Sequence, residues 1–304
     1  MNKNMFSMFN IPNLLTASNM LCGILSILLS LSGRIDLAPY PIFLGAIFDF
    51  LDGFMARILK QQGELGKQLD SLADMVTFGL APGVMMMGVL VFLTYPGADA
   101  FREIISSQSI PEETTYTIKH MDLIVHDYSY YFIEDYKMKL LNFQYGLSNL
   151  KLHSYFPFMA LIITVFSMFR LAKFNLDTRQ SESFIGVPTP ANTIFFCMFP
   201  LILAQDFAEG SFQFQVREFI MQVWVLIPII VIMSISLISE IPLFSLKFKH
   251  FKWKGNEIRF IFLITCSLLI PLTRFWSMGI IVLLYLILSI IENILKTKKH
   301  EIQS

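Results

Sequence analysis

The stretch DFLDGFMARILKQQGELGKQLDSLAD, residues 49–74, places four aspartates inside a chain that is 55% hydrophobic. They are Asp49, Asp52, Asp70 and Asp74, separated by three, eighteen and four residues. Apolar runs flank the stretch on both sides, and the polar segment KQQGELGK lies within it. The pattern predicts two antiparallel helices joined by a tight turn, with acidic residues near the joined ends of both.

Helical spacing groups these residues into two stripes, because residues three or four apart share one face of a helix. The first stripe comprises Asp49, Asp52, Gly53, Ala56 and Arg57, and the second comprises Gly66, Asp70 and Asp74. Since the turn between the helices is short, we expect the two stripes to face each other.

The composition of the whole chain indicates a membrane protein. Only 15% of the 304 residues are charged, against roughly 25% in soluble domains, and the mean hydropathy is +0.60. A formal net charge of zero gives no basic field for nucleic acid, so the expected environment is the lipid bilayer. The three cysteines lie in apolar runs and are expected to be small buried hydrophobes, and the histidines lack zinc-ligand spacing.

The fold class that this predicts is an all-α, polytopic helix bundle, since each helical span needs about 20 mostly apolar residues. About eight such segments can be drawn, near residues 14–32, 38–59, 70–95, 155–175, 190–206, 219–239, 257–273 and 276–295. The first is longer than the apolar core of a signal peptide, and no small-residue cleavage site follows it, so we interpret it as a retained span. Residues 96–154 form the single polar insertion.

The distribution of Lys and Arg predicts the orientation of these spans. With the N-terminus in the cytoplasm, fifteen of these cations fall on the inner side and eight on the outer side, five of them in the long insertion. Eight spans with both termini cytoplasmic therefore satisfy the positive-inside rule. This topology puts the aspartates at the cytoplasmic ends of the second and third spans.

Four carboxylates at membrane depth need neutralisation, because each costs about 2.5–3.5 kcal/mol on insertion scales. Divalent metal ions bound by carboxylate oxygens would supply it, and oxygen-only ligands favour Mg²⁺ or Mn²⁺ over zinc. The small residues leave room for a bulky ligand, and Arg57 could fork onto a phosphate. The pattern thus indicates a pyrophosphate site with one carboxylate free to act as a general base. The alternative is that the acids pair with Lys60 and Lys67 at a solvated helix end.

The motif Asp49-x2-Asp52-Gly53-x2-Ala56-Arg57-x8-Gly66-x3-Asp70-x3-Asp74 is similar to the signature of the CDP-alcohol phosphotransferases, without any departure. The resemblance implies a membrane enzyme with a six-helix core, commonly a homodimer, that releases CMP from a CDP-alcohol. On this basis residues 1–304 form one catalytic domain. Its core spans residues 11–240, interrupted by the insertion, and two further spans follow at residues 257–295.

The same resemblance implies a role for each position of the motif. Asp49, Asp52 and Asp70 are expected to bind metal, and Asp74 is expected to bind metal and act as general base. Residues expected to contact CDP-diacylglycerol are Gly53, Arg57, Gly66 and, from the start of the first span, Pro12, Asn13 and Thr16. For the preceding residues, MFSMFN, two interpretations stay open: an interfacial segment where lipid could enter sideways, or a frayed tail.

Four further segments resemble the phosphatidylserine synthase branch of this family. They are IPNLLTASNMLCG, DSLADMVTFGLAPG, FRLAKFN and GVPTPAN, beginning at Ile11, Asp70, Phe169 and Gly186. The implied reaction joins L-serine to CDP-diacylglycerol and gives phosphatidylserine and CMP. Arg170, Lys173 and Asn175 are the candidate serine ligands, with positive-inside anchoring as the competing interpretation of the two cations. The long insertion departs from this branch.

Two other functions remain open at this point. The aspartate motif alone does not separate serine from glycerol 3-phosphate, inositol phosphate or choline as the acceptor. An ion-coupled transporter could also use paired acids, although such proteins show internal repeats, and the acidic stretch occurs once in this sequence.

Overall fold

A computed structural model describes residues 9–95, 128–148, 152–176, 184–244, 253 and 256–303. Several segments of the sequence lie outside these residues: most of MFSMFN, most of the polar insertion, and most of the chain between the predicted spans 219–239 and 257–273.

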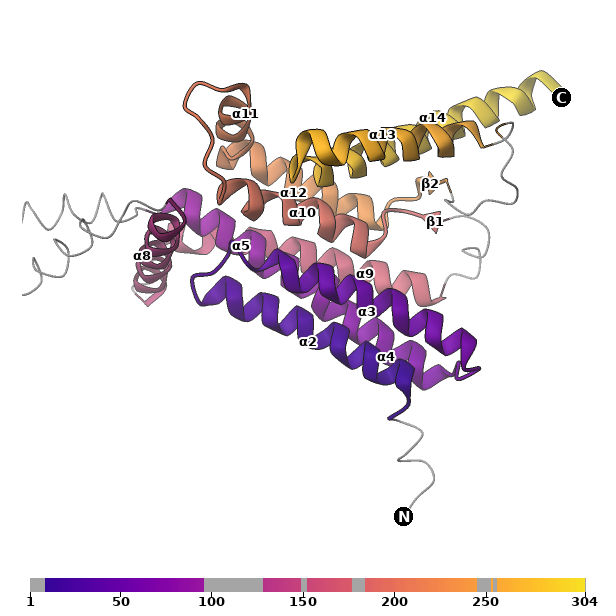
Figure 1. The fold of residues 1–304 in the computed structure, drawn as a ribbon, viewed down its shortest axis with the longest axis horizontal. Coiled ribbons are helices and arrows are strands. Elements are labelled where there is room, and N and C mark those ends of the chain that lie inside the picture. Colours follow the sequence, from indigo (N-terminus) through magenta and orange to yellow (C-terminus); the bar gives the residue numbers. More distant parts are fainter. Residues whose placement is uncertain are drawn as a thin grey trace, which may run out of the picture.

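The described chain is a helical bundle elongated along one axis (Figure 1). Its lengthwise elements are α2 (Ile11–Leu31), α3 (Pro39–Ile58), α4 (Glu64–Asp74), the π-helix η1 (Met75–Leu80), α5 (Ala81–Thr94), α9 (Ile162–Leu176), α10 (Thr189–Leu203), α12 (Val223–Ile238), α13 (Glu257–Thr273) and α14 (Trp276–Gln303). The 3₁₀-helix η2 (Leu152–Leu161) precedes α9. Two shorter or transverse helices, α8 (Tyr128–Ser148) and α11 (Phe212–Ile220), lie at one end of the bundle (Figure 1). The described residues contain one minimal antiparallel pairing, between β1 (Phe184–Ile185) and β2 (Pro242–Leu243).

All eight predicted apolar segments coincide with helices, which confirms the helical fold class. Four helices of the described chain are long and apolar enough to span a bilayer: Ile11–Leu31, Glu64–Thr94, Tyr155–Leu176 and Trp276–Ile294. A fifth candidate combines α11 and α12, which are bent by 71° relative to each other. The segment predicted near residues 219–239 starts inside α11, and the chain turns between Ile220 and Val223 before α12 covers the rest of it.

The third predicted span contains a change of helical geometry. Glu64–Thr94 is continuous, but η1 widens it into a π-turn between α4 and α5. Pro82 has no N–H, so it cannot donate to the carbonyl of Phe78 four residues earlier. The hydroxyl of Thr193 on α10 donates to that carbonyl at 2.9 Å, and Thr164 on α9 donates to the carbonyl of Gly79 at 3.0 Å. Hydroxyls from neighbouring helices thus satisfy backbone groups that the regular helix would have paired.

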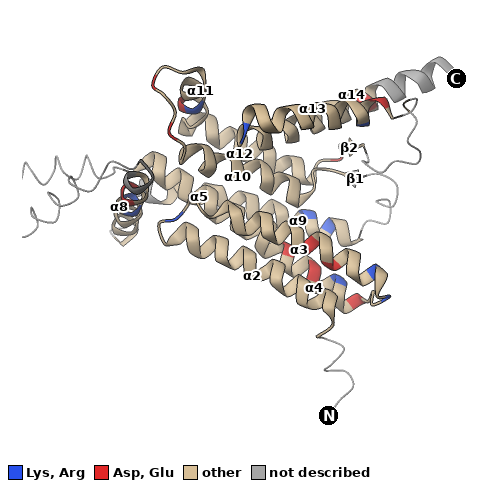
Figure 2. Cartoon of the chain, in the orientation of Figure 1, with Lys and Arg blue, Asp and Glu red and all other residues tan. Residues whose placement is uncertain are grey.

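Burial and charge are arranged as a bilayer requires. The core is centred on α5 and α10, whose buried side chains include Met85, Met86, Leu90, Phe196 and Ile202. Large apolar side chains remain exposed along α2 and α13, where hydrocarbon rather than water would cover them. Charged residues gather toward the two ends of the bundle and leave its middle apolar (Figure 2). The described helices therefore form an integral membrane protein.

Candidate functional site

The acidic residues of the opening motif converge from two helices, as their spacing predicted. Asp49 on α3 and Asp70 and Asp74 on α4 each offer a carboxylate oxygen, and these oxygens all lie within 4.8 Å of one another. All three side chains are half-buried. Figure 2 shows the acids of α3 and α4 beside each other at the end of the bundle opposite α8.

Small residues bring α2, α3 and the start of η1 into close contact beside this acid cluster. A Cβ atom added to Gly23 would approach the Cα of Thr77 to 2.7 Å, and one added to Gly45 would approach Cγ2 of Thr77 to 2.8 Å. Real Cβ atoms do not come so close, so both positions need glycine. The Thr77 hydroxyl also donates to the backbone carbonyl of Asn19 at 2.8 Å. This packing fixes the position of α4 along the axes of α2 and α3.

Two polar side chains of α2 hold two of the acids. The Thr16 hydroxyl donates to Oδ2 of Asp52 at 2.5 Å, and Nδ2 of Asn19 donates to Oδ1 of Asp74 at 3.1 Å. Both Thr16 and Asn19 are buried. The sequence analysis did not single out Asn19; the available signal was an amide three residues after Thr16, on the same face of an apolar helix. Asp52 lies outside the cluster formed by the other three acids.

A polar pocket of about 260 Å³ opens next to the acid cluster, between α2, α3 and α4. Its lining contains every residue predicted to contact the CDP group: Pro12, Asn13, Thr16, Gly53, Arg57 and Gly66. Asp52 and Asp70 also line it, and so connect it to the acids. Arg57 is exposed, and its Nε donates to the Gly53 carbonyl at 3.0 Å, which holds the guanidinium along the pocket wall.

The three candidate serine ligands on α9 lie apart from this polar pocket. Arg170 is buried, with Nε 3.1 Å from the carbonyl of Val187 and Nη2 3.4 Å from that of Gly186. Lys173 donates to Glu240 at 3.1 Å. Asn175 is nearer the acids, because its amide donates to the Ser71 hydroxyl at 2.8 Å, one residue after Asp70.

The segment GVPTPAN connects α9 to two other elements. Gly186 has φ +76°, and a Cβ there would lie 2.7 Å from the carbonyls of Leu237 and Ser239, so only glycine fits. Its amide donates to the carbonyl of Ile241 at 2.9 Å. Because Arg170 binds the carbonyls of this turn, it ties α9 to the loop before α10.

The donor set of the acid cluster fits a hard divalent cation. The three ligand groups are carboxylates, which suit Mg²⁺ or Mn²⁺. Within the described chain none of the three forms an ion pair with Lys or Arg, and Lys67 instead donates to the carbonyl of Asn175 at 3.4 Å. The alternative in which lysines neutralise the acids at a solvated helix end therefore finds no support in this arrangement.

Comparison with known proteins agrees with this site. Residues 9–108, which include all four aspartates, match the family model described as CDP-alcohol phosphatidyltransferase. The chain contains a CDP-alcohol phosphatidyltransferase domain. The matched residues form α2, α3, α4, η1 and α5, which supply both the acid cluster and the polar pocket.

Individual relatives also match this chain, and one of them matches over most of its length. A Bacillus subtilis protein named CDP-diacylglycerol–serine O-phosphatidyltransferase is 40% identical over 95 residues, which cover 28% of this chain and 54% of that protein. A Helicobacter pylori protein of the same name is 24% identical over 284 residues, covering 92% of this chain and 90% of that one. An archaetidylserine synthase from Methanothermobacter thermautotrophicus is 37% identical over 98 residues, which cover 31% of this chain and 41% of that protein.

Proposed function

We propose that this chain is a CDP-diacylglycerol–serine O-phosphatidyltransferase. The observation that carries the proposal is the cluster of Asp49, Asp70 and Asp74 beside the polar pocket, both built by the matched domain. The names of the two bacterial relatives and of the archaeal relative described above all include serine. Serine is therefore favoured over glycerol 3-phosphate, inositol phosphate or choline as the acceptor.

Substrate binding follows from the lining of the polar pocket. The CDP group would enter between α2, α3 and α4, where Gly53 and Gly66 leave the helix backbones accessible. Arg57 would bind a phosphate through two N–H groups, as a guanidinium fork does. Pro12, Asn13 and Thr16 would border the cytidine or its phosphate at the start of α2. These assignments place the phosphorus that carries diacylglycerol toward Asp70.

The transfer step needs a proton acceptor for the hydroxyl of serine. Asp74 would take that proton as the serine oxygen forms its bond to the phosphorus bearing diacylglycerol. The bond from this phosphorus to the bridging pyrophosphate oxygen breaks, and CMP leaves with that oxygen. Asn19 holds one oxygen of Asp74, so the carboxylate keeps a fixed orientation toward the acid cluster. A base held in place in this way contributes about 10²–10⁴-fold to a rate.

Asp49, Asp70 and Asp74 would hold Mg²⁺ or Mn²⁺, with Asp52 as a further ligand on the side of the polar pocket. A divalent cation bound there supplies charge neutralisation for the two phosphates and for the departing CMP. The Thr16 hydroxyl fixes one oxygen of Asp52, as partners of metal-binding carboxylates commonly do.

The serine subsite is proposed at the end of α9. Asn175 approaches the acids most closely, through Ser71 on α4. Lys173 and Arg170 would supply positive charge for the serine carboxylate, while both also bind backbone carbonyls of the following segments. Their hydrogen bonds to backbone carbonyls also agree with the competing interpretation, in which these two cations are positive-inside anchors.

An acceptor assay tests the proposed function directly. We expect purified enzyme with labelled CDP-diacylglycerol to form phosphatidylserine and CMP when L-serine is supplied, and no labelled product with glycerol 3-phosphate, inositol phosphate or choline. Formation of another phospholipid with one of these acceptors would contradict the serine assignment and leave the family intact. Substrate transport without release of CMP would contradict the enzyme class.

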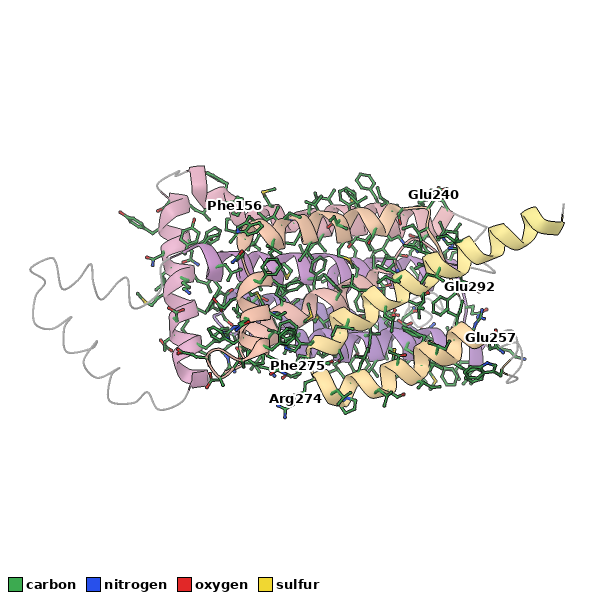
Figure 3. All side chains as sticks on the ribbon, turned by 90° about the horizontal axis from the view of Figure 1, so that it is seen from above. Phe156, Glu240, Glu257, Arg274, Phe275 and Glu292 are labelled. Carbon is green, nitrogen blue, oxygen red and sulfur yellow. The ribbon has the colours of Figure 1, made fainter. Side chains whose placement is uncertain are left out.

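We also propose the membrane arrangement that the sequence predicted: eight spans, both termini in the cytoplasm, and the active site at the cytoplasmic face of the cytoplasmic membrane. In support, the start of α2, the joined ends of α3 and α4, and the exit of α14 share one end of the bundle (Figure 1). Arg274 and Phe275 mark the turn between α13 and α14, whereas Glu257 and Glu292 lie toward that shared end (Figure 3). A single domain over residues 1–304 and a homodimer complete the proposal, the homodimer resting on the family resemblance alone.

Asn19 gives a prediction about how Asp74 is held. Replacing Asn19 by Leu keeps the size of the side chain but removes the N–H donor 3.1 Å from Asp74. Loss of such a partner commonly costs about 10–100-fold in metal affinity or activity. We expect kcat and the affinity for Mn²⁺, measured by electron paramagnetic resonance, to fall by that factor while the KM for serine changes little. Ser26→Ala, a buried change on the same helix away from the acids, is the control and should leave both values within about twofold.

A further inference from the structure

Helix α14 holds the strand β2 through three side chains on one of its faces. Tyr285, Ser289 and Asn293 lie four residues apart, so they point to the same side of the helix. The Tyr285 hydroxyl donates to the carbonyl of Phe244 at 2.8 Å, and the amide of Asn293 donates to the carbonyl of Pro242 at 2.6 Å. The N–H of Phe244 donates to the Ser289 hydroxyl at 3.4 Å. We call these three contacts the α14 clamp.

Aromatic packing closes the clamp on the side of α13. The ring centroid of Phe244 lies 4.8 Å from that of Tyr285 and 5.8 Å from that of Phe262 on α13. Phe244 is 5% exposed, and Ser289 is fully buried. The two C-terminal helices therefore enclose the segment after β2, and a backbone group that lost its partner there could not turn to water instead.

The strand β2 in turn holds the backbone turn to which Arg170 is bound. It pairs with β1, and the two strands lie between α14 and the end of α9 (Figure 1). Directly after β1, the N–H of Gly186 donates to the carbonyl of Ile241 at 2.9 Å. The guanidinium of Arg170 donates to the carbonyls of Gly186 at 3.4 Å and Val187 at 3.1 Å. A continuous series of hydrogen bonds thus runs from α14 to Arg170.

Lys173 depends on the same stretch of chain. Its Nζ donates to the carbonyl of Ile238 at 3.4 Å and forms an ion pair with Glu240 at 3.1 Å. Ile238 ends α12, and Glu240 lies two residues before β2. Both cations of the proposed serine subsite are therefore held by the chain that leads into β2, whereas the polar pocket for the CDP group is built by α2, α3 and α4.

We propose that Tyr285, Ser289 and Asn293 are positioning residues for the acceptor: through β2 they fix Arg170 and Lys173 where these cations meet the carboxylate of serine. The proposal rests on the proposed function for the identity of the acceptor. Long cationic side chains lose freedom when they bind a small anion, so holding them in place beforehand strengthens binding. A loosened clamp should therefore weaken the binding of serine and leave the binding of the lipid substrate unchanged.

The first experiment removes one hydroxyl from the clamp. Tyr285→Phe keeps the ring against Phe244 but leaves the carbonyl of Phe244 without its donor. We expect the KM for L-serine to rise about three- to tenfold, the size of one lost hydrogen bond. The KM for CDP-diacylglycerol should stay within about twofold. Asn293→Leu, which removes the donor to Pro242 and keeps a side chain of similar size, should repeat this result.

Tyr136→Phe is the matched control. It removes a hydroxyl that also donates to a backbone carbonyl, that of Ser30 at 2.9 Å, on the transverse helix at the opposite end of the bundle. It should lower the unfolding temperature of the purified protein about as much as Tyr285→Phe does, with both KM values within about twofold. The proposal would be overturned by equal rises of the two KM values in Tyr285→Phe, by no rise in either, or by the same serine effect in Tyr136→Phe.

The second experiment follows the link itself and needs no substrate. Amide hydrogen exchange is measured by mass spectrometry on the unaltered protein and on the three variants. We expect peptides that contain Gly186 and Val187 to exchange faster in Tyr285→Phe and Asn293→Leu, and at the unaltered rate in Tyr136→Phe. Unchanged exchange in both clamp variants would show that α14 does not hold this turn, and the proposal would fail. Because no acceptor is present, a wrong serine assignment appears in the acceptor assay and leaves this result unaffected.

Discussion

Replacing Asp74 by Asn should lower kcat for phosphatidyl transfer by about 10³-fold, because the amide cannot accept a proton from serine. The exchange keeps the shape of the side chain and one oxygen for a metal ion. Asn19 can still meet this residue, since its amide lies 3.1 Å from Oδ1 of Asp74. Binding of CDP-diacylglycerol should stay measurable, because the polar pocket is lined by other residues. Turnover and binding of labelled lipid are measured on the same preparation.

The control for this change is an acid at the other end of the bundle. Asp36 lies in the turn between α2 and α3 and pairs with Arg34, with 2.8 Å between Nη2 and Oδ2. Asp36→Asn should leave turnover within about twofold, as surface ion pairs contribute little. If Asp74→Asn retained near-normal rates, the proton acceptor would have to be another acid of the cluster. If it lost lipid binding and turnover together, Asp74 would act in substrate binding rather than in proton transfer.

The sequence predicted the helices and the acid cluster because both depend on local patterns. Apolar runs of spanning length located the lengthwise helices, and spacings of three and four residues indicated which face each aspartate occupies. A connection as short as residues 59–63 leaves the joined helices few ways to pack, which brings Asp49 toward Asp70 and Asp74. Gly53, Arg57 and Gly66 belong to the two stripes that spacing defines. Pro12, Asn13 and Thr16 could be expected at the CDP group only through the family resemblance, since nothing in their own spacing joins α2 to α3.

Features that depend on distant contacts were not predicted. The π-turn after Asp74 is stabilised by Thr193, which is 115 residues away from its partner Phe78 along the chain. The role of Asn19 depends on Asp74, 55 residues later. The bend between α11 and α12 could not be predicted from hydropathy either, because the hydropathy of an apolar segment is the same whether its helix is straight or bent. These contacts require the packed helices themselves.

The helix α8 was missed for a different reason. The sequence analysis treated residues 96–154, which contain it, as a single polar insertion. In the structure Phe132, Tyr136, Leu140 and Phe143 are buried on one face of α8, and Tyr136 donates to the carbonyl of Ser30 at 2.9 Å. Spacings of four, four and three residues are helical, but charged residues between them hid the pattern in a window chosen for spanning segments.

Removal of divalent metal should have an effect as large as the loss of Asp74. Asp49, Asp70 and Asp74 offer oxygens within 4.8 Å of one another, and no described Lys or Arg neutralises them. With excess chelator we therefore expect CMP release to fall by at least about 10³-fold, since several kcal/mol of charge stabilisation is lost. Added Mg²⁺ or Mn²⁺ should restore it.

The acid cluster can be separated from other metal sites by single changes. Asp49→Asn removes one charge from the cluster, so the concentration of Mn²⁺ that gives half-maximal activity should rise about tenfold or more, and direct Mn²⁺ binding should weaken equally. Glu134→Gln, at the other end of the bundle where Glu134 pairs with Lys137 at 2.7 Å, should leave both values unchanged. Full activity in excess chelator would remove the metal from the mechanism. Unaltered Mn²⁺ binding in Asp49→Asn would place the metal outside this cluster, even if activity fell, because the carboxylate would then act on the substrate directly.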